Sequence, residues 1–151
     1  MTDNNRTNHL ILLVKSGGSG RWRLAAALKG AGFRIVCLNE IKRSWDAVNE
    51  WLIDPMMDSQ STIRVVKKYM MENSVKFDAC FSYDEYGVIL ASCIAEELQL
   101  PCIPVQLIEE IRNKYNFRKR CQAAGVYVPK FVKLNGAGLN ISTEEELQVF
   151  F

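Results

Sequence analysis

The stretch HLILLVKSGGSG, residues 9–20, constrains the fold more than any other part of the sequence. Its first half is a continuous apolar run of strand length, and its second half is a glycine cluster that lets the backbone turn sharply. The next residues, RWRLAAALKGAG, have the spacing of an amphipathic helix with Gly32 as its C-terminal stop, and FRIVCL has the composition of a second strand. This order predicts a parallel β-α-β unit.

The rest of the chain continues the alternation of strands and helices. Apolar residues recur at helical intervals in 43–53 and 61–73. FDACFS at 77–82 is a third strand candidate, and the apolar stretch after it, DEYGVILASCIAEEL, predicts a helix pressed into the core. Ser82 and Glu85 have the spacing of a capping box at the start of that helix.

The last predicted strand is PCIPV at 101–105, which we place at a strand end or a sheet edge because Pro104 cannot donate a hydrogen bond. A helix from about 106 to 124 follows, and it can break near Arg112 or Asn113. We therefore predict a doubly wound α/β fold: a Rossmann-like, mainly parallel sheet of about four strands with helices on both faces.

Charge and composition exclude several classes of function. The 19 basic and 17 acidic residues nearly balance, so the whole protein has no strong field to gather nucleic acid or an anionic membrane. His9 is the only histidine and the five cysteines are widely spaced, which argues against a Cys/His zinc site and for reduced core thiols. No signal pattern and no apolar run of about 18 residues is present. We expect a soluble, cytoplasmic protein.

The glycine loop lies where doubly wound proteins bind ligands, outside the carboxyl end of the first strand and at a helix N-terminus. Gly17 and Gly18 at its centre favour an anion, although a plain tight turn explains them equally well. The loop lacks the Gly-Lys-Ser/Thr of a P-loop. A dinucleotide fingerprint would use Gly18, Gly20 and Glu40, but Arg23 stands where its third glycine belongs.

Asp84 and Glu85 place two carboxylates at the head of the core helix, at the same predicted sheet edge as the glycine loop. Acidic side chains at a helix start are stabilised by the positive end of the helix dipole, typically by about 0.3–1 kcal/mol. Helix capping therefore explains this pair without any chemistry, and a role in the cleft is the alternative.

The stretch 112–120, RNKYNFRKR, concentrates five cations in nine residues. Lys114 and Arg118 are four residues apart and share one helix face, while the other three cations point elsewhere. A solvated face is the ordinary outcome for such a run. A nucleic-acid patch with interleaved Tyr115 and Phe117 is a second interpretation, and a phosphate held by one face is a third.

The sequence from FDACFS to VPKF, about 77–131, resembles the end of the N-terminal domain of ATP-grasp ligases. The resemblance is to the branch that joins amino acids or other carboxylates to amines, such as amino-acid ligases and carnosine-synthase-like enzymes. In that family a D-K-x-x-x-R helix and an A-G-[VI]-x-[VI]-P segment lead out of the first domain. The matching positions are Lys114, Arg118, Ala124, Gly125, Val126, Val128 and Pro129, whereas Asn113 stands where aspartate is usual.

The resemblance implies nucleotide binding by Lys114 and Arg118, with Gly17, Gly18 and Glu85 facing the same cleft toward the acceptor substrate. It implies ATP and Mg²⁺ as requirements of a full-length enzyme that makes an acyl phosphate from a carboxylate and passes it to an amine. Both substrates would be small molecules.

If the resemblance holds, residues 1–134 are the domain that precedes the ATP-grasp fold, and residues 135–151 are a linker with the start of a truncated ATP-grasp domain. The family's catalytic residues would lie beyond the end of the chain, so we expect the fragment alone to be inactive. Its apolar C-terminal end could draw two copies into a homodimer. A free-standing Rossmann-like ligand-binding or regulatory module remains the alternative.

Overall fold

The computed structural model describes residues 9–15 and 22–131, and the chain divides into two compact units, 1–105 and 106–151. In the first unit four strands, β1 (Leu10–Val14), β2 (Arg34–Asn39), β3 (Glu50–Ile53) and β4 (Ala79–Phe81), form one sheet in the order β3-β2-β1-β4. All three strand pairs are parallel. The predicted doubly wound α/β fold with four strands is therefore confirmed.

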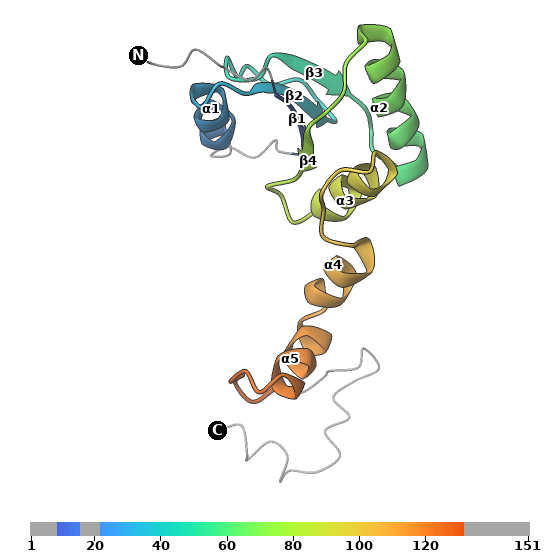
Figure 1. Cartoon of the computed structure of the whole chain (residues 1–151). Coiled ribbons are helices and arrows are strands. Elements are labelled where there is room, and N and C mark those ends of the chain that lie inside the picture. Colours follow the sequence, from blue (N-terminus) through green and yellow to red (C-terminus); the bar gives the residue numbers. More distant parts are fainter. Residues whose placement is uncertain (1–8, 16–21, 132–151) are drawn as a thin grey trace. The chain divides into compact units, whose positions relative to one another are not determined.

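Helices cover both faces of this sheet (Figure 1). The helix α1 (Trp22–Gly30) packs on one face, and α2 (Ser59–Asn73) and α3 (Val88–Glu97) pack on the other. Alternate residues of the central strand β1 point to opposite faces: Leu12 and Val14 join the α2 and α3 core, whereas Ile11 and Leu13 join the α1 core. Two covered faces explain why β1 is apolar throughout.

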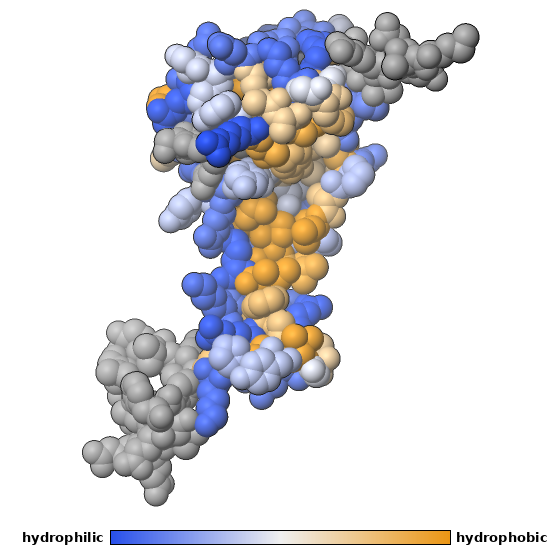
Figure 2. All heavy atoms as spheres, turned by 90° about the vertical axis from the view of Figure 1, so that its left-hand side faces the viewer, coloured by the Kyte–Doolittle hydropathy of each residue, from blue (hydrophilic) through white to orange (hydrophobic). Residues whose placement is uncertain are grey.

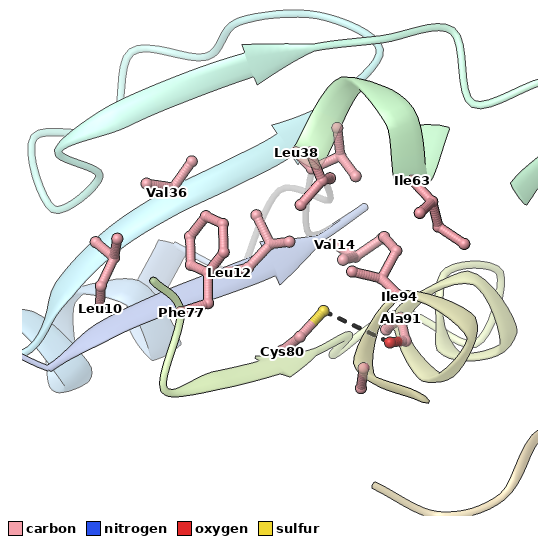
Figure 3. Packing of buried hydrophobic residues seen from close by; sticks show 12 residues of the cluster. Leu10, Leu12, Val14, Val36, Leu38, Ile63, Phe77, Cys80, Ala91 and Ile94 are labelled. Atoms are coloured by element: carbon pink, nitrogen blue, oxygen red, sulfur yellow. Dashed lines mark hydrogen bonds between the residues drawn. The ribbon is translucent and has the colours of Figure 1, made fainter. Parts of the chain in front are cut away.

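The larger core lies on the α2 and α3 side (Figure 3). Side chains from five elements meet there, including Leu12 of β1, Leu38 of β2 and Ile94 of α3. The thiol of Cys80 donates a 3.5 Å hydrogen bond to the carbonyl oxygen of Ala91, which joins β4 to α3. Burial, and to a lesser extent the nearby Cys102 thiol, raises the pKa of Cys80 to about 12, so this thiol stays protonated.

The prediction of a helix at 43–53 is wrong. Residues 50–53 form the edge strand β3, whose Trp51 packs toward the α1 core while Leu52 packs toward the α2 and α3 core. Asn49 begins this pairing: its backbone N–H donates to the Ile35 carbonyl oxygen, and its side-chain oxygen accepts from the Ile35 N–H. Pairing with β2 therefore overrides the helical spacing of the segment.

The predicted strand at 101–105 is also absent, and the sheet takes its fourth strand from 50–53 instead. Pro101 and Pro104 lack backbone N–H groups, so the segment can offer few donors to a strand ladder. The N–H of Val105 donates to the Glu96 carboxylate of α3 at 2.9 Å. That contact fixes the point where the next helix begins.

The second unit contains most of α4 (Val105–Arg112) and all of α5 (Lys114–Ala123), so the long basic helix is broken at Asn113 as the sequence allowed. Gly125 has φ +72° just after α5, a left-handed conformation that suits glycine. Hydrophobic side chains form part of the protein surface (Figure 2), and on α4 Ile111 is 41% exposed. Among the described helices none is long and apolar enough to cross a bilayer.

Candidate functional site

The strand order reverses between β1 and β4, and this defines the candidate site of the first unit. The chain adds β2 and β3 on one side of β1 and then places β4 on the other side. Open parallel sheets bind ligands outside the carboxyl ends of the two strands at such a switch point. Lys15, which follows β1, and the segment after β4 therefore lie at one sheet edge, which agrees with the sequence-based prediction for the segment after β4. Gly17 and Gly18 lie outside the described residues.

Gly87, which sequence reasoning missed, brings the start of α3 against the end of β1. It is the N-cap residue of α3, and a Cβ added to it would lie 3.0 Å from the Val14 carbonyl oxygen and 2.8 Å from the Lys15 Cβ. The distance to Lys15 is shorter than real Cβ atoms show, and the distance to Val14 is tighter than nine in ten Cβ contacts. The only sequence signal was a glycine in front of an apolar helical run, which does not by itself predict a close approach.

Lys15 occupies the first position after β1 with φ +53°, in the left-handed region that lysine rarely adopts. Its backbone N–H donates to the Leu38 carbonyl oxygen at 2.8 Å, and its ammonium lies 3.1 Å from the Glu40 carboxylate. Glu40 is the acid that a dinucleotide site would use for ribose. Here its carboxylate is paired with Lys15 instead.

The segment after β4 is a hydrogen-bonded turn rather than the predicted capping box. The Ser82 hydroxyl accepts from the Asp84 N–H and donates to the Asp84 carbonyl oxygen, both at 3.0 Å, and the Asp84 carboxylate accepts from the Tyr86 N–H. The helix α3 begins only at Val88. Glu85 lies in this turn and is exposed, so its place at the sheet edge agrees with the prediction while its role stays a prediction.

A cavity of about 290 Å³, called here the edge pocket, opens beside Lys15. It lies between the start of α3 and the loop that joins β3 to α2. Its lining includes Lys15, Asp58, Tyr86 and the apolar side chains Met56, Ile89 and Leu90. Asp58 caps α2, and the hydrogen bonds that it accepts from the Ser61 hydroxyl and N–H hold the pKa of its carboxyl below the ordinary value.

The start of α5 in the second unit is strongly cationic. Asn113 caps the helix by accepting a 3.1 Å hydrogen bond from the Asn116 N–H, so this departure from the family's aspartate preserves the cap. Lys114 is the first helical residue and is exposed, and the first turn has no acidic residue. A cation at the positive end of a helix is unfavourable unless an anion compensates for it.

Arg118 lies one turn after Lys114 and is half-buried. Its guanidinium is 5.8 Å from the centre of the Phe131 ring, and Phe131 also contacts Tyr115 edge-on at 5.7 Å. These contacts fold the segment after Gly125 back onto α5. The contacts hold Arg118 in place. The nucleotide-binding roles of Lys114 and Arg118 stay predictions.

The two remaining cations on α5 already have partners. Arg120 pairs with the Glu110 carboxylate of α4, and the Lys119 ammonium lies 5.1 Å from the centre of the Tyr115 ring. The described residues contain no group of three or more His, Cys, Asp or Glu side chains that could hold a metal ion.

Comparison with protein families and curated proteins gives no match for the chain. Solved structures do match it. The L-amino acid ligase from Bacillus licheniformis superposes with a TM-score of 0.66 at 21% identity, over 85% of this chain and 35% of that one. Phosphoribosylglycinamide synthetase from Anaerococcus prevotii gives 0.65 at 17% identity, over 94% of this chain and 34% of that one.

A third match is N5-carboxyaminoimidazole synthetase from Staphylococcus aureus complexed with ADP, with a TM-score of 0.62 at 15% identity, over 86% of this chain and 34% of that one. The chain thus spans about a third of the length of these structures. All are ATP-grasp enzymes, matched over their N-terminal portion. The resemblance seen in the sequence is confirmed at the level of the fold.

Proposed function

We propose that the chain, whose fold is that of the N-terminal portion of ATP-grasp enzymes, is the first domain of an ATP-dependent carboxylate-amine ligase. The observation that carries the proposal is the agreement of two independent features. One is the fold of the first unit. The other is the order of the basic helix and the A-G-V-x-V-P segment in the second unit. Chance similarity of short motifs does not explain both.

In this proposal Lys114 and Arg118 neutralise phosphate charge of the bound ATP. Their side chains project from the same face of α5 because they are four residues apart. The positive end of α5 has no acid in its first turn, which leaves that charge available to an anion. Arginine and lysine are both suited to phosphate: lysine as a compact charge and arginine as a planar fork of donors.

The chemistry would be attack of a substrate carboxylate on the γ-phosphate of ATP, with release of ADP. An amine would then attack the acyl phosphate and form the amide, with release of inorganic phosphate. Gly17, Gly18 and Glu85 would help to hold the acceptor at the sheet edge. In the family that the sequence resembles, Mg²⁺ and the reacting groups are held by the domains that follow this one. On that basis we propose that this fragment alone is inactive.

The test is an assay of the full-length protein encoded by the parent gene. Pairs of amino acids are supplied with ATP and Mg²⁺, and release of ADP and phosphate is measured with formation of the amide product. Hydroxylamine added in place of the amine should trap the acyl phosphate as a hydroxamate. Release of AMP and pyrophosphate would contradict the proposal because it indicates an adenylate, and so would the absence of ADP with every pair.

A further inference from the structure

We propose that the edge pocket binds a small aliphatic carboxylate, held by the ammonium of Lys15 with its apolar chain between α3 and the loop before α2. The ligand is either a simple carboxylic acid or an apolar amino acid, because both present the same group. That this ligand is a ligase substrate rests on the proposed function. Its binding to the chain does not.

The walls of the pocket select an apolar chain. Ile89, Leu90 and Cys93 of α3 face the cavity from one side, and Met56 and Met57 of the loop face it from the other. Methionine is unbranched and polarisable, so it adapts to ligands of different shape. A volume of about 290 Å³ is just below the range of roughly 300–1,000 Å³ that is usual for ligand pockets, which favours a compact ligand.

Lys15 is the group in the pocket lining that can bind an anionic head group. It is the one cation of the pocket among the described residues, and the lone acid, Asp58, already accepts hydrogen bonds from Ser61 with both carboxylate oxygens. The present partner of Lys15, Glu40, has a side chain that is 54% exposed. An ion pair this accessible to water contributes little free energy, so a ligand carboxylate can replace Glu40 without a large penalty.

Backbone strain at the pocket is an independent indication of function. Four non-glycine residues in the described part of the chain have positive φ. Ser74 and Gln99 follow the ends of α2 and α3, where this conformation is ordinary. The other two, Lys15 and Met56, both line the edge pocket. Strained residues persist where the surrounding structure fixes them, and they cluster at ligand sites.

Met56 is held in its strained conformation by a buried acid. Its N–H donates a 2.7 Å hydrogen bond to the Asp54 carboxylate, which also accepts a 2.8 Å hydrogen bond from the buried Thr62 hydroxyl of α2. Asp54 and Thr62 are 8% and 0% exposed. The loop wall is therefore built into the core, which preorganises the pocket for binding.

The test is a titration of the 151-residue chain, labelled with ¹³C at the methionine methyl groups, with 4-methylpentanoate and, separately, with L-leucine. Resonances are assigned with single Met→Leu variants. We expect the Met56 and Met57 methyl signals to shift and saturate in the millimolar range, while that of Met71, exposed on α2, stays in place. The neutral isostere 4-methylpentanamide should bind at least about tenfold more weakly, because it lacks the charge that Lys15 recognises.

Two substitutions test the role of Lys15. Lys15→Met keeps the apolar stem and should weaken binding about tenfold or more, whereas Lys76→Met, at an exposed lysine before β4, should leave it unchanged. Glu40→Gln removes the competing partner and should strengthen binding about two- to fivefold. If Lys15→Met does not fold, the comparison of acid with amide on the unaltered chain still decides the matter.

Equal binding of the acid and the amide would overturn the proposal, as would equal shifts at Met71 or no saturable shift at Met56 and Met57. Tighter binding of L-leucine than of 4-methylpentanoate would identify an amino acid as the ligand. The proposed function is judged separately by ADP release. Ligase activity without binding in this pocket would sink this inference alone, and binding without ligase activity would sink the proposed function alone.

Discussion

Gly87 lies directly against Lys15: a Cβ at position 87 would be 2.8 Å from the Cβ of the lysine. The contact places the start of α3 at the carboxyl end of β1. The φ of Gly87 is −100°, so glycine is needed here for space and not for backbone conformation. The residue is thus a spacer whose size sets the separation of two elements.

Gly87→Ala should therefore destabilise the fold by about 1–3 kcal/mol, because the added methyl group overpacks the contact with β1. Gly30→Ala is the matched control. Gly30 ends α1 and has nothing within 4 Å of an added Cβ, so alanine there should be neutral or stabilise by about 0.4–1 kcal/mol. Urea unfolding followed by circular dichroism measures both. Equal midpoints for the two variants would contradict the close packing at Gly87.

Lys114→Ala in the full-length enzyme should raise the apparent KM for ATP about tenfold or more, because a charge-assisted contact to phosphate is lost. The thermal midpoint should be unchanged or slightly raised, since Lys114 is exposed and a cation at a helix start is unfavourable. Lys119→Ala, on another face of α5, is the control and should leave KM near that of the unaltered enzyme. Unchanged nucleotide kinetics in Lys114→Ala would reject its assignment.

Tyr69 should make stability depend on pH in the alkaline range. Burial and the hydrogen bond of its hydroxyl to the Glu50 carboxylate, 2.6 Å long, raise the pKa of Tyr69 to about 12. A raised pKa favours the protonated form in the folded state, so this stabilisation is complete below about pH 10 and is lost as the pH rises toward 12. Tyr69→Phe should cost about 1 kcal/mol at pH 7.

The difference between Tyr69→Phe and the unaltered chain should narrow steadily above about pH 10 when urea midpoints are compared. Lysine deprotonation affects both proteins equally and cancels in that difference. A constant gap up to pH 11 would show that the hydroxyl does not titrate as its contact with Glu50 requires.

Asp78 should contribute a dependence of the opposite sign. Its carboxylate accepts a 2.7 Å hydrogen bond from the Leu10 N–H and a further one from His9, and these contacts lower the pKa of Asp78 from its ordinary 3.8. A lowered pKa gives stability that is present above the ordinary value and is lost as the pH falls through it. Asp78→Asn should be less stable at pH 7, and this deficit should shrink below about pH 4 in urea unfolding curves. A deficit independent of pH would contradict the role of the charge.

The parts of the fold that could be predicted are those in which local pattern and tertiary packing agree. The run at 9–14 is apolar because both sheet faces are covered, and the helix at 61–73 lies within α2. The segment 43–53 could not be predicted, because helical spacing of Trp45, Val48 and Leu52 is equally compatible with a turn followed by a short edge strand. Pairing with β2, a long-range contact, decides between them.

The candidate site was predictable in its location but not in its detail. Parallel strands place the segments after β1 and β4 at one edge whatever their residues, so Glu85 could be placed there from the strand pattern. Met56 and Gly87 could not be placed in the site from the sequence. Their importance depends on a positive φ and on a close approach of two elements, and neither changes the spacing of residue types along the chain. The edge pocket is built from three segments, at 15, 56–59 and 86–93, and only the folded chain brings them together.

The alternating burial of β1 fixes the register of this strand and therefore the position of Lys15 at its end. Leu12 and Leu13 commit to opposite cores, so sliding the strand by one residue would exchange both sets of side chains at once. Apolar packing at the centre of the sheet thus determines the position of the Lys15 side chain at the carboxyl end of β1. Substitutions designed to change the ligand selectivity proposed for the edge pocket should therefore alter the pocket walls and leave β1, which positions Lys15, unchanged.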